Sequence, residues 1–367
     1  MQRKEFRQFL ADGHTMALML VMPIFILILF AVAIDMRPKH NGTALLLRDS
    51  SPTVRTLVSA MENSTYFRFK ALISNEEEGE RLINSGKVHF ILTVPENFTR
   101  DLVRRERPIL LLDADCSDPG AIGAALEALE AIRANFLAGS DFDGPLAHLR
   151  PGLGPFELRI HRRFNPESIS RYNVIPGVIG MLLTMIGVML MSLSVTREME
   201  RGTMENILAM PLMPLEIMIG KISPPIVLGL VLSAALLTLS TAVFSVPMLG
   251  SPLLLLFAMA LFMCCNLAIG FAISSLAANQ TQAIQLSIMV LMPSFLLSGF
   301  IFPFDGMPPW ARAIGCCIPL THFLRIARGI MLKGCDMGDV YQNILCLSAI
   351  AIVVAAIASL LHRRTLD

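Results

Sequence analysis

Charged residues are scarce in this sequence. Asp, Glu, Lys and Arg make up 16% of the 367 residues, whereas hydrophobic residues make up 54%; ordinary soluble domains are nearer a quarter charged. The charges are also clustered, which leaves long apolar stretches without any of these four residues. The formal net charge is +1 and no basic patch dominates, which argues against a nucleic-acid-binding protein.

A nucleotide-binding loop is also missing. A P-loop needs glycine five residues before a Gly-Lys pair and Ser or Thr directly after it. The pair at residues 220–221 has Leu215 at the upstream position and Ile222 after the lysine, and the pair at residues 86–87 fails in the same way. The chain has no nucleophile elbow and no H-E-x-x-H motif either. We therefore expect no catalytic residue, no metal and no cofactor bound by this chain.

The seven cysteines lack the spacing of a metal site. Cys335 and the adjacent residues Cys316 and Cys317 fall in one segment between two apolar stretches. If that segment faces an oxidising compartment, Cys335 can pair with one of the other two. The alternative is that these cysteines simply pack as small apolar side chains.

The sequence instead has several apolar stretches about as long as a bilayer-spanning helix, roughly 20 residues. The predicted spans are residues 16–34, 174–195, 222–244, 253–277, 283–301 and 344–361. They predict an α-helical polytopic membrane protein with six transmembrane helices. Residues 1–15 are predicted to form an amphipathic helix in the membrane interface, because Phe6, Phe9 and Leu10 share one helical face.

Residues 35–173 hold most of the charge and predict an inserted α/β domain. Period-2 alternation and helical runs alternate along this segment. The predicted strands are 44–48, 67–73, 88–94 and 109–113, and the predicted helices are 52–62, with Ser51 as N-cap, 76–84 and 119–137. An odd number of spans precedes the domain, so it is predicted to be extracytoplasmic.

Basic residues near the span ends predict that both termini are cytoplasmic. They cluster before the first span, after the second and at the end of the chain. One segment disagrees, since residues 302–335 carry four basic residues on the predicted outer side: Arg312, Arg325, Arg328 and Lys333.

The segment after the second span, residues 196–216, is the most informative stretch. Gly202 interrupts the preceding helix, and Thr203 is a good N-cap for a short new helix with Glu205 in its first turn. That helix has an apolar face formed by Met204, Ile207 and Leu208. Such a helix either docks into the groove of a partner protein or is a solvated loop helix.

Residues 197–211, REMERGTMENILAMP, resemble the signature loop of ABC-2 type permeases. The resemblance is to the drug-export branch, which has a large extracytoplasmic domain between the first two transmembrane helices, and it covers nearly the whole chain. Further similar motifs, in the same order as in that branch, are residues 86–98, 163–166, 302–309 and 319–323.

The resemblance implies that the loop after the second span is a coupling helix, which contacts a separate ABC ATP-binding subunit. The implied coupling residues are Arg197, Glu198, Glu200, Arg201, Gly202, Thr203, Met204, Glu205, Ile207 and Leu208. It also implies that residues 302–335 form a re-entrant hairpin on the outer side, which removes the conflict over the basic residues there.

The implied protein is the permease of a bacterial inner-membrane exporter of amphipathic drugs or lipid-like molecules. ATP and Mg would bind to the partner ATPase, and the other implied partners are a second permease copy or paralogue and a periplasmic membrane-fusion adaptor. The alternative function is a membrane receptor or assembly scaffold that acts through its extracytoplasmic domain.

Four residues are candidates for a substrate path: Met181, Met185, Met189 and Asn266. Methionine is flexible and polarisable and suits promiscuous apolar surfaces. The alternatives are methionines that face lipid or pack, and an asparagine that forms a hydrogen bond between helices. The spans contain no Asp, Glu, Lys or Arg, which argues against proton-coupled transport.

Overall fold

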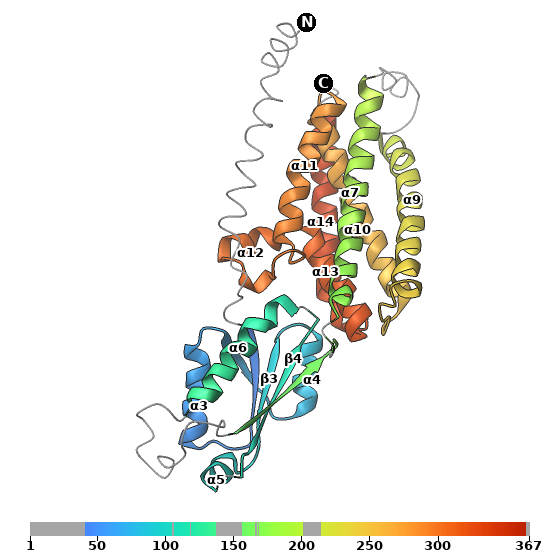
Figure 1. The fold of residues 1–367 in the computed structure, drawn as a ribbon. Helices are drawn as coiled ribbons and strands as arrows, with labels where there is room; N and C mark the ends of the chain where they lie inside the picture. The colour runs from blue at the N-terminus through green and yellow to red at the C-terminus, as the bar shows by residue number, and fades with distance from the viewer. Residues whose placement is uncertain are drawn as a thin grey trace, which may run out of the picture. The chain divides into compact units, whose positions relative to one another are not determined.

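The computed structural model describes residues 41–104, 106–117, 119–136, 156–165, 167, 169–200 and 214–364. The chain divides into a helical unit and an α/β unit, the latter formed mainly by residues 35–173 (Figure 1). The predicted helices at residues 1–15 and 16–34 lie outside the described residues.

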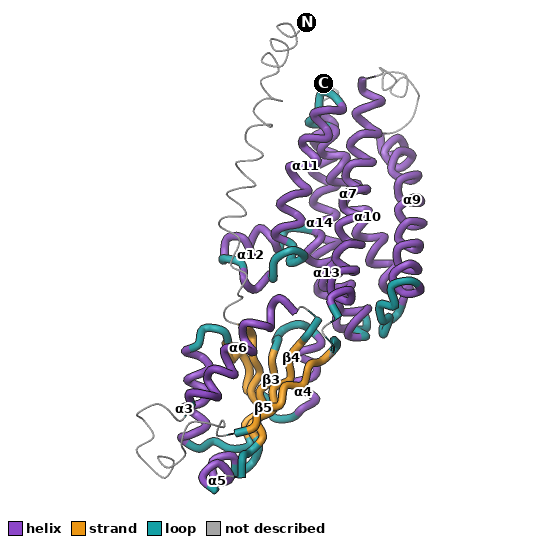
Figure 2. The backbone as a smooth tube through the Cα atoms, in the orientation of Figure 1, coloured by secondary structure: helices purple, strands orange, loops and turns teal. Residues whose placement is uncertain are grey.

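The α/β unit contains one five-stranded sheet with strand order β2-β1-β3-β4-β5 (Figure 2). Its strands are β1 (Asn41–Leu47), β2 (Phe67–Leu72), β3 (Phe90–Val94), β4 (Ile109–Asp115) and β5 (Glu157–Arg163), and its helices are α3 (Pro52–Asn63), α4 (Glu76–Asn84), α5 (Phe98–Val103) and α6 (Pro119–Asn135). Strand β1 pairs in parallel with β2 and β3, β4 is antiparallel to β3, and β5 is parallel to β4.

Successive side chains of a strand point to opposite faces of this sheet. Both faces are apolar, and different helices pack against each of them. Phe90 and Leu92 of β3 belong to the larger core, to which α3, α5 and α6 also contribute. Ile91, between them, belongs to a smaller core on the opposite face, together with Ile83 of α4. A sheet with helices on both faces is the expected arrangement for parallel strands that are buried on both sides.

Asp49 connects the starts of two helices in the α/β unit. Its carboxylate accepts hydrogen bonds from the backbone N–H of Ser51, the N-cap of α3, at 2.9 Å and of Thr99 in α5 at 3.0 Å. Ser51 makes no side-chain capping bond, and its hydroxyl contacts the Thr99 hydroxyl instead. Burial raises the pKa of Asp49, but the hydrogen bonds from Thr99 and Ser51 outweigh this and hold the pKa below its ordinary value of 3.8.

We predict that Asp49→Ala lowers the free energy of unfolding by about 1 kcal/mol at neutral pH, as for the loss of a helix cap. Because the folded pKa is depressed, this stabilisation is present above the unfolded value of 3.8 and is lost as pH falls through the folded value. Unfolding of wild type and variant in detergent at pH 7 and about pH 3 measures the difference. An equal difference at both pH values would show that the carboxylate charge has no part in it.

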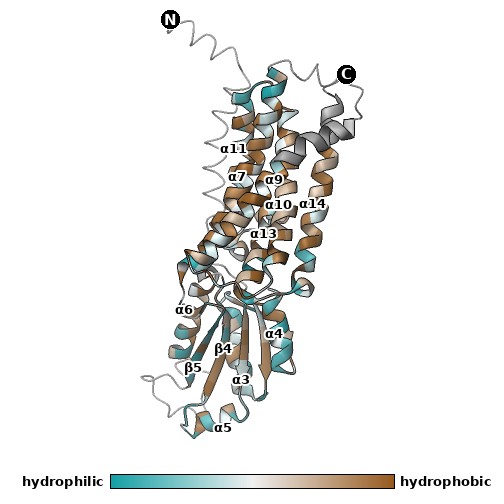
Figure 3. Ribbon diagram, turned by 90° about the vertical axis from the view of Figure 1, so that its right-hand side faces the viewer, coloured by the Kyte–Doolittle hydropathy of each residue, from teal (hydrophilic) through white to brown (hydrophobic). Residues whose placement is uncertain are grey.

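The helical unit contains long apolar helices. Its elements are α7 (Ser170–Glu200), α9 (Pro214–Ala242), α10 (Pro252–Ser274), α11 (Gln280–Leu297), the short η1 (Phe304–Gly306), α12 (Pro309–Gly315), α13 (Pro319–Arg328), the π-helical η2 (Gly329–Lys333) and α14 (Met337–Arg364). Five of the described helices are long and apolar enough to cross a membrane (Figure 3). The described chain is therefore a polytopic helical protein with an inserted α/β region.

Helices α12 and α13 with η2 form a bent pair, with an 82° bend between its two parts, which is called the hairpin below. Thr321 and His322 stabilise the bend, since their side chains bond the Gly315 and Cys316 carbonyls at 2.7 and 2.9 Å. His322 also contacts the Asn343 side-chain oxygen of α14 at 3.2 Å. Hydrogen bonds therefore fix the bend between α12 and α13, and one of the same residues also contacts α14.

Several helix ends differ from the sequence prediction. Helix α11 ends at Leu297 and not at residue 301, and Gly299, with φ of +88°, turns the chain there. Helix α10 ends at Ser274, three residues before the predicted end. These residues carry no charge, so composition alone extended the predicted spans into the turns.

The cysteines are free thiols in this structure. Cys335 is buried, whereas Cys316 and Cys317 are exposed. The Cys317 thiol lies 3.6 Å from the Ala313 carbonyl of α12, the helix that precedes it. The structure thus contains no disulfide among these three residues, and of them only Cys335 is packed in the interior.

Candidate functional site

The C-terminal end of α7 carries the described part of the predicted coupling segment. The helix continues to Glu200, so Arg197, Glu198 and Glu200 lie in its last turn. Residues 201–213, which include Gly202 and the predicted short helix after it, lie outside the described residues. The described part of the site therefore consists of Arg197, Glu198, Glu200 and the residues that they contact.

Glu200 joins this end of α7 to the start of α11. One carboxylate oxygen accepts the backbone N–H of Gln280 at 2.7 Å, and the other accepts the Gln280 side-chain amide. The first residues of a helix have N–H groups without an intrahelical partner, and a negative charge is favoured there. Glu200 therefore supplies to α11 an acceptor that α11 lacks within its own sequence.

The start of α11 is itself well ordered. The Asn279 side chain accepts the N–H of Gln282 at 2.8 Å, and the Gln282 side chain accepts the N–H of Ala278 at 2.7 Å. This arrangement resembles a capping box, except that Gln282 accepts from the residue before the N-cap Asn279. Since three side chains fix the first turn of α11, Glu200 contacts a rigid part of the bundle.

A second polar contact joins α7 and α11 deeper in the bundle. The hydroxyls of Ser192 and Ser287 lie 3.0 Å apart, and both residues are fully buried. Ser192 is eight residues from Glu200, which is about 12 Å along an α-helix. The two helices are thus joined by hydrogen bonds at two levels.

Glycines make close contacts between α7 and its neighbours possible. A Cβ built on Gly187 would lie 2.9 Å from the Asn266 Cβ of α10, and one built on Gly270 would lie 2.5 Å from the Val188 carbonyl oxygen. At Gly180 it would collide with side chains of α13. Small residues of this kind allow close backbone approach between membrane helices. Sequence reasoning missed these glycines, although their presence inside apolar spans was the available signal.

The structure does not bring the four candidate substrate-path residues together. Met185 is 39% exposed, and Met181 and Met189 share its helical face. Asn266 is 1% exposed and lies against Gly187, which is two residues from Met185 and so about 200° around the helix. Asn266 is therefore an interior residue, while the methionine face lies at the surface of the described helices.

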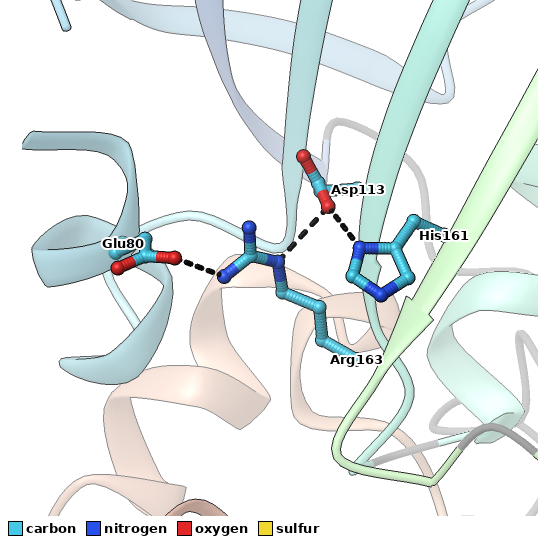
Figure 4. Close-up of polar contacts among 4 residues, drawn as sticks. All are labelled: Glu80, Asp113, His161 and Arg163. Atoms are coloured by element: carbon cyan, nitrogen blue, oxygen red, sulfur yellow. Dashed lines mark hydrogen bonds and ion pairs between the residues drawn. The ribbon is translucent and has the colours of Figure 1, made fainter. Parts of the chain in front are cut away.

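The α/β unit has one prominent polar cluster, on the sheet face that carries α4 (Figure 4). Asp113 of β4 contacts the His161 ring nitrogen at 2.7 Å and accepts a hydrogen bond from Arg163 Nε at 2.9 Å. Arg163 also donates to Glu80 of α4 at 2.9 Å. Burial lowers the pKa of Arg163, but its hydrogen bonds to Glu80 and Asp113 outweigh this and raise the pKa above its ordinary value.

This cluster lies next to the residues that lead into α7. Asn165, two residues after Arg163, is buried and exchanges two hydrogen bonds with the Ile169 backbone, at 2.9 and 3.1 Å. Ion pairs and a side-chain turn therefore order the chain just before α7 begins. The cluster contains no nucleophile beside a base. Its contacts join β4, β5 and α4, which is a structural role.

The long apolar helices place this chain in the class of polytopic membrane proteins. Its candidate site consists of hydrogen bonds that join the end of α7 to the start of α11. The chain belongs to the ABC-2 transporter family, because the family model described as ABC-2 family transporter protein matches residues 14–360. It is a permease-type, multi-pass membrane protein and not itself an enzyme.

Curated relatives cover nearly the same length. The probable multidrug ABC transporter permease YbhS of Escherichia coli (strain K12) is 30% identical, over 99% of this chain and 96% of that protein. The probable multidrug ABC transporter permease YbhR of the same strain is 28% identical, over 99% and 97%. The inner membrane transport permease YhhJ, also of that strain, is 30% identical over 79% and 77%.

Proposed function

We propose that this chain is the permease subunit of a bacterial inner-membrane ABC exporter, driven by a separate ATP-binding subunit that docks on residues 201–213 and on Glu198 just before them. The observation that carries the proposal is the Glu200–Gln280 link, because it ties the start of the coupling-like segment to a second long helix. A docked partner that moves this segment would therefore move α7 and α11 together. ATP and Mg bind on the partner.

The proposed cargo is an amphipathic drug or lipid-like molecule. Two relatives are named probable multidrug permeases, which supports a drug as cargo. The proposed assembly contains two permeases, either identical or paralogous, with their termini in the cytoplasm. The hairpin of α12, α13 and η2 is then the re-entrant element on the outer side. The α/β domain is extracytoplasmic in this arrangement and recruits a periplasmic adaptor.

Co-purification tests this function. We expect an ATP-binding subunit to copurify with the wild-type chain and to be lost with Gly202→Leu, which places a bulky side chain where the sequence predicts a helix break. Glu198→Ala should weaken the complex and reduce transport in proteoliposomes. Gly338→Ala is the matched control, since no heavy atom lies within 4 Å of a Cβ built there.

Two outcomes would contradict the proposal. One is a wild-type chain that copurifies no ATPase; the other is a Gly202→Leu protein that keeps both complex and transport. A chain that captures an adaptor but supports no ATP-driven transport would instead favour the scaffold alternative, in which the α/β domain alone is the working part.

A further inference from the structure

Asn266 of α10 is a buried amide with an unused acceptor. The residue is 1% exposed, and its Nδ2 donates to the Phe262 carbonyl of its own helix at 2.9 Å. Its Oδ1 is buried and has no hydrogen-bond partner among the residues that the structure describes. A buried polar atom without a partner costs about 1–3 kcal/mol, and such atoms are rare enough in native proteins to require an explanation.

The chemistry of the amide decides which group could satisfy it. The orientation of the amide follows from its neighbour, since the Phe262 carbonyl can only accept and must face Nδ2. The free atom is therefore the oxygen, which can only accept. Its complementary partner carries an N–H or O–H donor. Water alone is a poor candidate, because the surroundings are apolar and a buried water needs two to four polar partners.

The surroundings of Asn266 form a glycine-lined seam between three helices. Gly187 of α7 lies under the Asn266 side chain, and the Met263 side chain fills the space beside it, 3.2 Å from a Cβ built on Gly187. The same methionine covers Gly229 of α9, where a built Cβ would lie 2.6 Å from Met263 Cγ. Glycine backbones and a flexible thioether can be rearranged around a guest more easily than interlocked branched side chains.

We propose that this seam between α7 and α10 is a substrate-binding site and that Asn266 Oδ1 binds the hydrogen-bond donor of the cargo. The proposal rests on the export function proposed above and narrows its substrate class to amphipathic molecules with an exposed N–H or O–H group. In the structure described here, α7 covers the seam at Gly187. Binding therefore requires α7 to separate from α10, which is the movement that a partner acting on the end of α7 would produce.

A binding role for the seam accounts for the presence of an asparagine with an unsatisfied oxygen inside an apolar helical bundle. A leucine would fill similar space without an unsatisfied polar atom, so stability alone favours leucine at this position. A residue that lowers stability in the free protein is expected where the protein needs that residue to bind cargo.

The test measures binding of two aromatic monocations to the purified wild-type complex and its variants. Ethidium carries two amino groups that donate hydrogen bonds, whereas tetraphenylphosphonium carries no donor. With Asn266→Leu and with Asn266→Ala, we expect the Kd of ethidium to rise about tenfold and that of tetraphenylphosphonium to stay unchanged. The thermal unfolding midpoint of Asn266→Leu should stay at or above that of wild type.

Ser274→Ala is the matched control, because Ser274 is buried in the same helix but its hydroxyl is satisfied by the Phe271 carbonyl at 2.7 Å. It should bind both cations like wild type. The inference is overturned if the Asn266 variants bind ethidium like wild type, if they lose both cations equally, or if both variants fail to fold. If the wild-type complex binds neither cation and moves no cargo, the proposed export function falls as well, which separates the two failures.

Discussion

Gly270→Leu is expected to abolish the folded helical unit. A Cβ at this position would lie 2.5 Å from the Val188 carbonyl oxygen and 3.2 Å from the Ser192 backbone nitrogen of α7. Backbone atoms inside a helix cannot rotate away as a flexible side chain can, so α7 as a whole would have to move. Overpacking of a well-packed core costs about 1–3 kcal/mol and occasionally more, and a leucine adds three further carbons beyond the Cβ.

The displacement would also break the hydrogen bond between Ser192 and Ser287. We therefore expect little monodisperse protein in size-exclusion chromatography of the detergent-solubilised variant, and a lowered thermal midpoint for the milder Gly270→Ala. Gly338→Leu is the matched control, because it lies in α14 with open space around it and gains up to about 1 kcal/mol of helix propensity. Equal behaviour of the Gly270 and Gly338 variants would refute the close packing of α7 against α10.

Local patterns predicted most of the α/β unit. Helix α4 has the predicted bounds Glu76–Asn84, because an Asn N-cap, an acidic first turn and a helical run agree there. Strands β1, β2, β3 and β4 were also found near their predicted positions. In each of them apolar residues are grouped, and turn residues surround them, so local sequence and tertiary structure favour the same conformation.

Two elements of the same unit could not be predicted in this way. Strand β5 (Glu157–Arg163) alternates only two aliphatic residues with charged ones, and its stability comes from pairing with β4 and from the Asp113 contacts. Helix α5 has six residues, which is too short for a periodic signal. Both elements depend on partners distant in the sequence.

The candidate site shows the same limit. The resemblance pointed to Glu200 as a coupling residue, but its contact Gln280 is 80 residues away, and no local pattern links the two. Likewise, a glycine inside an apolar span indicates close packing only when the helix opposite it is known. The sequence thus located one side of the Glu200–Gln280 contact, and the structure supplied the other side and the glycine contacts.

The link between Glu200 and Gln280 leads to the second large expected effect. Glu200→Ala removes the acceptor for both hydrogen bonds, while residues 201–213, where the partner is proposed to dock, are unchanged. We expect the ATP-binding subunit still to copurify and to hydrolyse ATP, but transport per ATP in proteoliposomes to fall about tenfold, within the range of coupling factors between linked sites. The reason is that only the Ser192–Ser287 contact would then join α7 to α11, so less of the motion at the end of α7 would reach α11, which continues directly into the hairpin segment.

A double variant at residues 200 and 280 tests whether the link itself is responsible for coupling. Glu200→Lys alone should uncouple transport, and adding Gln280→Glu should restore part of it, because an opposite-charge pair re-forms across the same two helix ends with the acidic residue at the start of α11. Met199→Ala, at the neighbouring and partly exposed position, is the matched control and should leave the ratio of transport to hydrolysis unchanged. Loss of ATPase binding in Glu200→Ala would assign Glu200 to the docking surface instead, and unchanged transport would show that the link to α11 carries no motion.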